Sequence, residues 1–170
     1  RHRFAYNLDD DHLRALYALT KMFDPTRPVV DNDGWEHVRT DIITIHDYAR
    51  FGDVLRERYG TEASLTHLVK TGRPLHYPPL LEEHLIAADA PVMLTEFGGI
   101  SYAPKPEEKW FGYGTVGSAD EYVAKLRELF QAVSDCPGLV GFCYTQLTDT
   151  EQETNGLLTE AREPKFDIGV

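Results

Sequence analysis

The chain has 170 residues, of which 42% are hydrophobic, and its formal net charge is −11. This length suffices for one sizeable hydrophobic core, with no sign of a second domain. The acidic charge argues against nucleic acid and anionic membrane surfaces as partners, because both are bound by basic patches. No apolar stretch is long enough to span a bilayer, and no signal segment opens the sequence.

The two cysteines and the first residue bear on the setting of the protein. Cys136 and Cys143 are seven positions apart. They predict neither a disulfide framework nor a paired metal-ligand motif. Together with the missing signal segment, they favour a reducing, cytoplasmic location. Because the sequence starts at Arg1 without an initiator methionine, we expect it to begin inside a longer chain.

The first half of the sequence alternates helix and strand signals. Acidic residues at 9–11 supply N-cap and first-turn carboxylates for a helix that ends at Asp24-Pro25. Its apolar stripe predicts packing on a sheet. Apolar runs that end in polar residues then predict strands at 29–32 and 42–46. Glycine-terminated apolar patterns predict short helices, namely 54–59 and 65–69, and a third is expected at 80–88.

The second half continues this alternation. Val92 to Thr95 form an apolar run that predicts a buried strand, followed by Glu96 and two glycines. Residues 101–117 are expected to form a long loop, whose aromatic side chains either bind sugar rings or plug the core. A capping box opens a helix that reaches Val133, and a last strand is expected at 139–144. The aromatic residues of the loop are Tyr102, Trp110, Phe111 and Tyr113.

Four apolar strands separated by helices predict an α/β fold with a parallel sheet. Four strands are half of an eight-stranded (β/α)8 barrel, the TIM-barrel type. In such a barrel the carboxyl ends of the strands carry the residues that do chemistry. By position alone, Glu96 is either such a catalytic carboxylate or a rim residue that caps or pairs.

Three motifs resemble the catalytic domain of glycoside hydrolase family 2. They are Asp24-Pro25-Thr26-Arg27-Pro28-Val29, Thr95-Glu96-Phe97-Gly98-Gly99, and Gly156-Leu157-Leu158-Thr159 with Pro164-Lys165. This family includes β-galactosidases, β-glucuronidases and β-mannosidases. The resemblance runs over nearly the whole chain and implies that residues 1–170 are the C-terminal half of the catalytic barrel, with strands five to eight.

The resemblance also implies roles for individual residues. Glu96 matches the glutamate that attacks the anomeric carbon, and Tyr48 matches the tyrosine that holds this nucleophile. A phenol donor would stabilise the ionised carboxylate and fix its direction of attack. Four further residues are expected to line the sugar site from the same rim, although buried side chains bonded to their neighbours are a common alternative. They are Trp35, His46, Tyr144 and Gln146.

One part of the family pattern is missing from the sequence. A retaining glycosidase needs a second carboxyl about 5 Å from the nucleophile, and the family places it in an Asn-Glu pair. No such pair occurs in this chain, so the resemblance places the general acid upstream of Arg1. From rim position alone, Asp31 or Glu36 would be nominated instead.

The substrate expected from the resemblance is a neutral β-glycoside such as a β-galactoside. β-Glucuronidases carry Asn-x-Lys before the glycine that matches Gly156, where the lysine can pair with a uronate. This chain has Glu153-Thr154-Asn155 at that place. No cofactor and no metal is expected within the chain.

Two other functions compete with a retaining exo-β-glycosidase. The first is a catalytically inactive sugar-binding or scaffolding half-barrel. The second is a metal-dependent hydrolase that uses Asp31, His46 and Glu96, although the sequence shows no tight ligand motif. A half-barrel has open sheet edges. We therefore expect the chain to associate through these edges or with the missing half of the barrel, and to be inactive in isolation.

Overall fold

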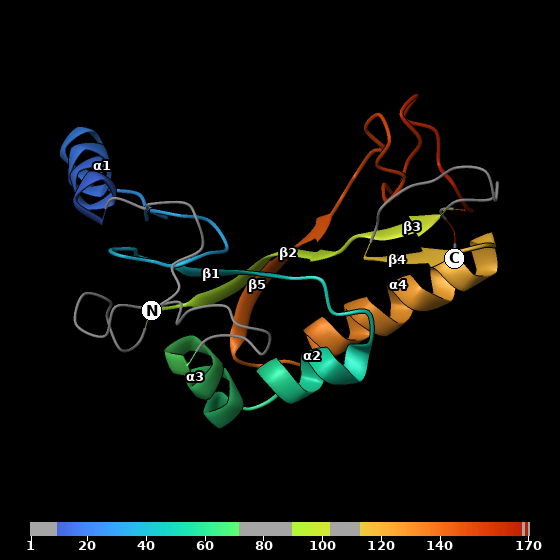
Figure 1. Cartoon of the computed structure of the whole chain (residues 1–170), viewed down its shortest axis with the longest axis horizontal. Helices are drawn as coiled ribbons and strands as arrows, with labels where there is room; N and C mark the ends of the chain where they lie inside the picture. Colours follow the sequence, from blue (N-terminus) through green and yellow to red (C-terminus); the bar gives the residue numbers. More distant parts are fainter. Residues whose placement is uncertain (1–9, 72–89, 103–112, 168, 170) are drawn as a thin grey trace.

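A three-stranded parallel sheet, ordered β1-β2-β5, forms the centre of the molecule (Figure 1). The computed structural model describes residues 10–71, 90–102, 113–167 and 169. The strands are β1 (Ile43–Asp47), β2 (Val92–Gly98) and β5 (Leu139–Thr145). They confirm three of the four predicted strands and the α/β class with a parallel sheet. The described residues do not form a closed barrel.

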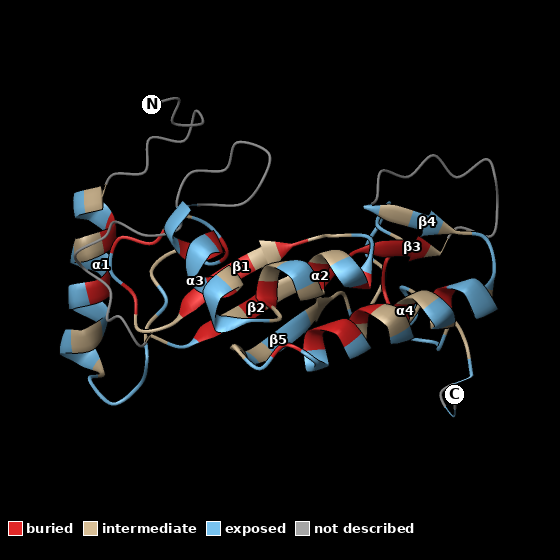
Figure 2. Cartoon of the chain, turned by 90° about the horizontal axis from the view of Figure 1, so that it is seen from below, coloured by how far each residue is buried: buried red, intermediate tan, exposed pale blue. Residues whose placement is uncertain are grey.

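Three helices cover one face of this sheet, as Figures 1 and 2 show from two directions. They are α2 (Gly52–Tyr59), α3 (Glu62–Thr71) and α4 (Ala119–Ser134), and all three were predicted from the sequence. None of the helices in the described part of the chain is long and apolar enough to cross a membrane. Between helices and sheet lies a core that includes Ile45, Leu55, Tyr59, Leu94, Phe97, Tyr122 and Leu129, each with no exposed surface.

The predicted capping box at the start of α4 forms with one change, because the Glu121 side chain bonds the residue before the N-cap. The Ser118 side chain accepts a hydrogen bond from the backbone N–H of Glu121 at 3.2 Å. The Glu121 carboxylate in turn accepts from the backbone N–H of Gly117 at 3.0 Å. Two of the backbone donors at this helix end are thereby satisfied, which fixes where α4 begins.

Helix α1 (Asp10–Phe23) has nearly the predicted bounds but a different environment. Figures 1 and 2 place it at one end of the molecule, beside the segment that leads into β1. Leu13 and Tyr17 are buried, whereas 46% of Leu16 and 78% of Phe23 are exposed. The expectation that the whole apolar stripe packs on the sheet is therefore wrong for the described residues.

The ends of the expected loop at 101–117 are strands instead. β3 (Ile100–Tyr102) and β4 (Gly114–Val116) pair in parallel as a separate two-stranded sheet. Trp110 and Phe111 lie outside the described residues, as does the helix expected at 80–88. Of the four aromatic residues expected to bind sugar rings or plug the core, the structure describes Tyr102 and Tyr113.

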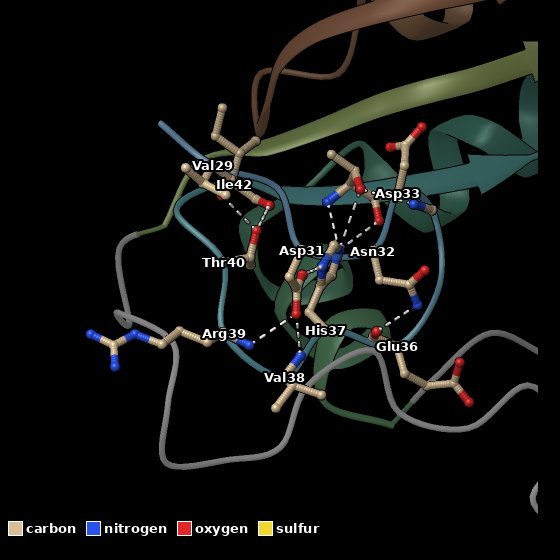
Figure 3. A network of polar contacts seen from close by, with 12 residues as sticks. Val29, Asp31, Asn32, Asp33, Glu36, His37, Val38, Arg39, Thr40 and Ile42 are labelled. Carbon is tan, nitrogen blue, oxygen red and sulfur yellow. Dashed lines mark hydrogen bonds and ion pairs between the residues drawn. The ribbon is translucent and has the colours of Figure 1, made fainter. Parts of the chain in front are cut away.

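The strand expected at 29–32 does not form, because its polar groups are used in a side-chain network (Figure 3). The Asp31 carboxylate accepts from the backbone N–H groups of Val38 and Arg39, at 2.7 and 2.9 Å. It also contacts Nδ1 of His37 at 2.6 Å, and both side chains are fully buried. Nε2 of His37 accepts from the backbone N–H of Thr44 on β1 at 2.9 Å. A buried Asp–His pair, rather than another strand, thus forms a hydrogen bond with this edge of β1.

Between Leu94 and Phe97, strand β2 contains one extra residue relative to both of its neighbours. Ile45 pairs with Leu94, but the next residue of β1, His46, pairs with Glu96. The register to β5 shifts over the same interval. Thr95 is therefore the extra residue of a β-bulge, a feature that turns side chains to new directions and is common beside active sites. Leu94 and Phe97 are both buried in the core despite their separation of three positions.

The Asp31–His37 pair predicts a specific loss of stability. Replacing Asp31 with Ala leaves the buried His37 and the backbone N–H groups of Val38 and Arg39 without their partner, so the free energy of unfolding should fall by about 3 kcal/mol at pH 7. Urea denaturation measures this change. Asp53→Ala is the matched control because the Asp53 side chain is 97% exposed. A loss no larger than that of the control would contradict the network.

The same substitution carries a pH dependence. Burial alone would raise the pKa of Asp31, but hydrogen bonds from His37 and two backbone groups outweigh it and leave the pKa lowered. The stability from the ionised carboxylate is therefore full above about pH 4 and is lost as the pH falls through the lower, folded-state pKa. The difference between wild type and Asp31→Ala should stay constant from pH 7 to 5 and shrink in more acidic buffer.

The end of β2 gives a second stability prediction. Gly98 has a φ angle of 95°, and a Cβ atom there would lie 2.2 Å from Cε2 of Tyr144. Gly98→Ala should lower the free energy of unfolding by about 3 kcal/mol, through backbone strain and overlap with the ring. Gly117→Ala is the control, since its Cβ would meet only Glu121 Oε2, at 3.9 Å. Equal urea midpoints for the two variants would contradict this packing.

Candidate active site

Tyr48 and Glu96 meet at the carboxyl ends of the neighbouring strands β1 and β2. The Tyr48 hydroxyl donates to Oε2 of Glu96 at 2.5 Å, so the expected approach of these two side chains is confirmed. Burial raises the pKa of Tyr48, and the hydrogen bond to Glu96 raises it further. The phenol therefore remains protonated at neutral pH. It can act as a fixed donor to a carboxylate.

The backbone before Tyr48 is held by a buried carboxylate. Asp47 accepts from Arg58 at 2.6 Å and from the Tyr59 hydroxyl at 2.6 Å, both on α2. The ring of Tyr48 stacks on that of Tyr113, with 3.7 Å between centroids and 6° between planes. The direction of the Tyr48 hydroxyl is thus set from the helix side and from the segment before β4.

His46 lies between two carboxylates. Its Nδ1 is 3.2 Å from Oε2 of Glu96, and its Nε2 is 3.1 Å from Oδ2 of Asp33. The sequence predicted that His46 contacts the sugar. In the structure its two ring nitrogens face the carboxylates of Glu96 and Asp33, and the contact of His46 with a sugar stays a prediction.

Trp35 is the most exposed of the predicted sugar contacts. Trp35 is 44% exposed. Its ring contacts the ring of His46 edge to face, with 6.4 Å between the two centroids. An exposed indole beside a carboxylate site offers an apolar surface to the face of a sugar ring. Trp35 therefore remains with the candidate site.

Tyr144 and Gln146 are committed to other contacts. The Tyr144 ring packs against Phe97 and Phe130, and burial raises its pKa. Its hydroxyl is 3.2 Å from that of Tyr122. Gln146 follows β5 and donates its amide to Asn155 Oδ1 at 2.8 Å. The structure thus places Tyr144 in the core beside α4 and ties Gln146 to the segment after β5, and it does not bring them to Glu96.

Asp33 is a site residue that the sequence reasoning missed. Its Oδ1 accepts from the hydroxyl of Thr95 at 2.7 Å, while Oδ2 faces His46. Asp33 lies in the loop before Trp35, and the missing signal was its position in an Asp-Gly turn directly after an expected strand. Thr95, the extra residue of the bulge in β2, is the partner that anchors it.

Of the two carboxylates nominated as a second catalytic group, Asp31 does not suit a general acid, which needs a raised pKa. Asp31 is buried against His37, and its pKa is lowered. The side chain of Glu36 points away from the Asp31–His37 pair (Figure 3). Burial raises the pKa of Asp33, but bonds from Thr95 and His46 outweigh this and lower it. Asp31 and Asp33 therefore do not have the raised pKa that a general acid needs.

A metal site is not seen in the described part of the chain. No cluster of three or more His, Cys, Asp or Glu side chains there is arranged to hold a metal ion. Asp31 is enclosed by its own network, apart from His46 and Glu96. The grouping of these three residues as metal ligands is thus not formed.

The motifs at either end of the chain shape the backbone. The Asp24 carboxylate accepts from the Thr26 hydroxyl and from Arg27, which closes the turn after α1. Near the C-terminus, Lys165 donates to Asp149 at 2.6 Å, and this carboxylate also accepts from the backbone of Gly156 at 2.8 Å. These motif residues hold the segments that flank the sheet and do not contact Glu96.

Comparison with known proteins finds a fold likeness among solved structures. No protein-family model and no curated protein matches the chain. Among solved structures, Faecalibacterium prausnitzii β-glucuronidase matches 92% of this chain with a TM-score of 0.55 and 22% identity. The matched region is 26% of that protein. At this identity the likeness shows a shared α/β fold, and the chain spans about a quarter of the length of its structural neighbour.

Proposed function

We propose that this chain carries the nucleophile half of the active site of a retaining exo-β-glycosidase. Glu96 is the nucleophile and Tyr48 its hydrogen-bond donor. The observation that carries the proposal is the bond from Tyr48 to Glu96 at the carboxyl ends of two parallel strands. The fold likeness to a β-glucuronidase and the three motifs of glycoside hydrolase family 2 support it.

The proposed reaction has two steps. Glu96 attacks the anomeric carbon and forms a glycosyl ester, while the bond to the leaving oxygen breaks and a general acid protonates that oxygen. Water then attacks the anomeric carbon, gives a proton to the same group and releases Glu96. Tyr48 stabilises the ionised form of Glu96 and aims Oε2, and Trp35 offers an apolar face to the sugar.

The general acid lies outside this chain in the proposal. Residues 1–170 then form the C-terminal half of a (β/α)8 catalytic barrel, and an upstream glutamate completes the pair about 5 Å from Glu96. The exposed side chains of Val140 and Phe142 on β5 fit this arrangement, since the remaining strands of a longer chain would cover them. The same edges would associate if the piece were made alone.

The substrate proposed is a neutral β-glycoside, with a β-galactoside as the first example. The structural neighbour is named for glucuronide hydrolysis, but the lysine that pairs with a uronate in such enzymes is absent here. Glu153, within the corresponding tripeptide, has the opposite charge to that lysine. A second negative charge would repel a uronate rather than attract it.

An inactive sugar-binding barrel is the second candidate. The exposed Trp35 would serve such a protein equally well, since an aromatic platform binds sugar without any catalytic carboxylate. Only the glycosidase needs Glu96 ionised and aimed. Activity of the Glu96 variants therefore separates the two.

In the longer enzyme, Glu96→Gln should lower kcat/KM for an aryl β-galactoside at least about 1000-fold while substrate binding changes little. The amide is nearly isosteric but cannot form the ester. Steady-state kinetics and calorimetric titration measure the two quantities. Glu57→Gln, an exposed position on α2, is the matched control and should leave both unchanged. Near-normal turnover in Glu96→Gln would refute the glycosidase proposal.

Tyr48→Phe should reduce kcat/KM for the same substrate roughly 10- to 100-fold. A hydrogen bond to a charged group contributes about 1.5–3 kcal/mol, and the phenyl ring keeps the stack on Tyr113. Tyr17→Phe is the control, because its hydroxyl bonds Asp41 beside α1 and not the site. If the two variants had the same activity, the proposed role of Tyr48 would be wrong.

A further inference from the structure

We propose that Tyr113 binds the leaving group of the substrate, and that the site takes β-glycosides whose leaving group carries a ring, either an aryl group or a second sugar. This inference rests on the proposed role of Glu96 and extends it to the class of substrate. It also assigns a function to the small β3–β4 sheet.

The ring of Tyr113 lies on the Tyr48–Glu96 pair and still offers surface to a ligand. It stacks on the ring of Tyr48, with 3.7 Å between centroids and 6° between planes. The Tyr48 hydroxyl in turn donates to Glu96. Although this stack covers one face of the Tyr113 ring, 46% of the residue is exposed. An exposed aromatic ring this close to the reacting carboxylate can bind the apolar face of a sugar or an aryl group.

The β3–β4 sheet fixes the position of Tyr113. Ile100 of β3 pairs with Gly114 of β4 in parallel register. Gly99 and Tyr113 come directly before these two residues, so the register makes them neighbours as well. Figure 1 shows the small sheet beyond the carboxyl end of β2. Paired strands thus carry Tyr113 to the end of the strand that holds the nucleophile.

Gly99 allows both tyrosine rings to lie against the backbone. Its φ angle is 60°, and a Cβ atom there would lie 2.8 Å from Cδ2 of Tyr113 and 2.9 Å from Cδ1 of Tyr48. Gly99 follows β2, which is the central strand of the sheet. Strands of a longer chain that pair with the outer edges of β1 and β5 would therefore leave Tyr113 accessible.

The assignment to the leaving group follows from the positions of two exposed rings. Trp35 contacts His46, which pairs with Glu96 across β1 and β2. Tyr113 contacts Tyr48, which bonds Glu96. An exposed aromatic ring thus lies beside each of two different neighbours of Glu96. The anomeric carbon that Glu96 attacks joins the sugar ring to the leaving group. Because Trp35 binds the sugar in the proposed function, Tyr113 is left for the leaving group.

Two alkyl glycosides that differ by one ring test this assignment in the longer enzyme. Methyl and benzyl β-galactoside release alcohols of similar basicity, so they need the same help from the general acid. Tyr113→Ala should lower kcat/KM for the benzyl glycoside roughly 5- to 10-fold more than for the methyl glycoside, which is the size of an aromatic contact. A loss shared by the two substrates, from a displaced Tyr48 or from weaker folding, cancels in this ratio.

Tyr48→Phe and Trp35→Ala are the matched controls, since both residues act on groups that the two glycosides share. Each should lower kcat/KM for both substrates by the same factor and keep the wild-type ratio. A wild-type ratio in Tyr113→Ala overturns the inference, because the residue then only supports Tyr48. A ratio that changes in Trp35→Ala instead would assign the leaving group to Trp35 and overturn it too.

Calorimetric titration of the Glu96→Gln variant gives a readout without turnover. Adding Tyr113→Ala should weaken the binding of benzyl β-galactoside roughly 5- to 10-fold more than that of methyl β-galactoside. An equal change for the two ligands would again contradict the inference. These results are separable from the proposed function. If Glu96→Gln retains turnover, the glycosidase proposal fails, whereas an inactive Glu96→Gln with an unchanged ratio in Tyr113→Ala overturns the leaving-group site alone.

Discussion

The bulge at Thr95 is the constraint on which the candidate site depends. In a regular strand Leu94 and Glu96 would point to the same face, and Leu94 is buried in the core under the helices. The extra residue breaks that alternation, so Glu96 pairs with His46 and leaves the core to Leu94 and Phe97. The same residue supplies the hydroxyl that holds Asp33. One local irregularity thus delivers Glu96 to the face where Tyr48, His46 and Asp33 gather.

The segment between α1 and β1 contributes residues to the candidate site. It is not a strand, because Asp31 binds His37 and two backbone donors, and His37 in turn accepts from β1. This buried network anchors the loop that carries Asp33, Gly34 and Trp35. Buried polar groups whose hydrogen bonds are all satisfied specify one conformation. The loss of a single partner costs folding free energy. The loop is therefore held by these bonds where it contacts His46.

Sequence patterns predicted most of the elements and the pair at the centre of the site. The helices have clear apolar periodicity or a capping box, and three strands have apolar runs that end in polar residues. Tyr48 and Glu96 could be paired because both end such strands. The strand at 29–32 was a wrong prediction, since Val29 and Val30 resemble a strand while Asp31 decides the conformation through partners six to eight positions away.

The roles of Tyr144 and Asp33 could not be predicted from the sequence, for a physical reason. Which face a strand residue occupies depends on register, and the register of β5 against β2 pairs Tyr144 with Phe97, a core residue. Asp33 contacts Thr95 and His46, and the bulge at Thr95 leaves no mark in hydrophobic alternation.

The central claim is that Glu96 forms a covalent bond with the sugar. The most direct measurement is to trap the longer enzyme with a 2-deoxy-2-fluoro β-galactoside that carries an activated leaving group, and to locate the label by peptide mass spectrometry. The account predicts one glycosyl ester, on Glu96, in the peptide that contains the Thr95–Gly99 motif. A label on any other residue, with Glu96 unmodified, would contradict it.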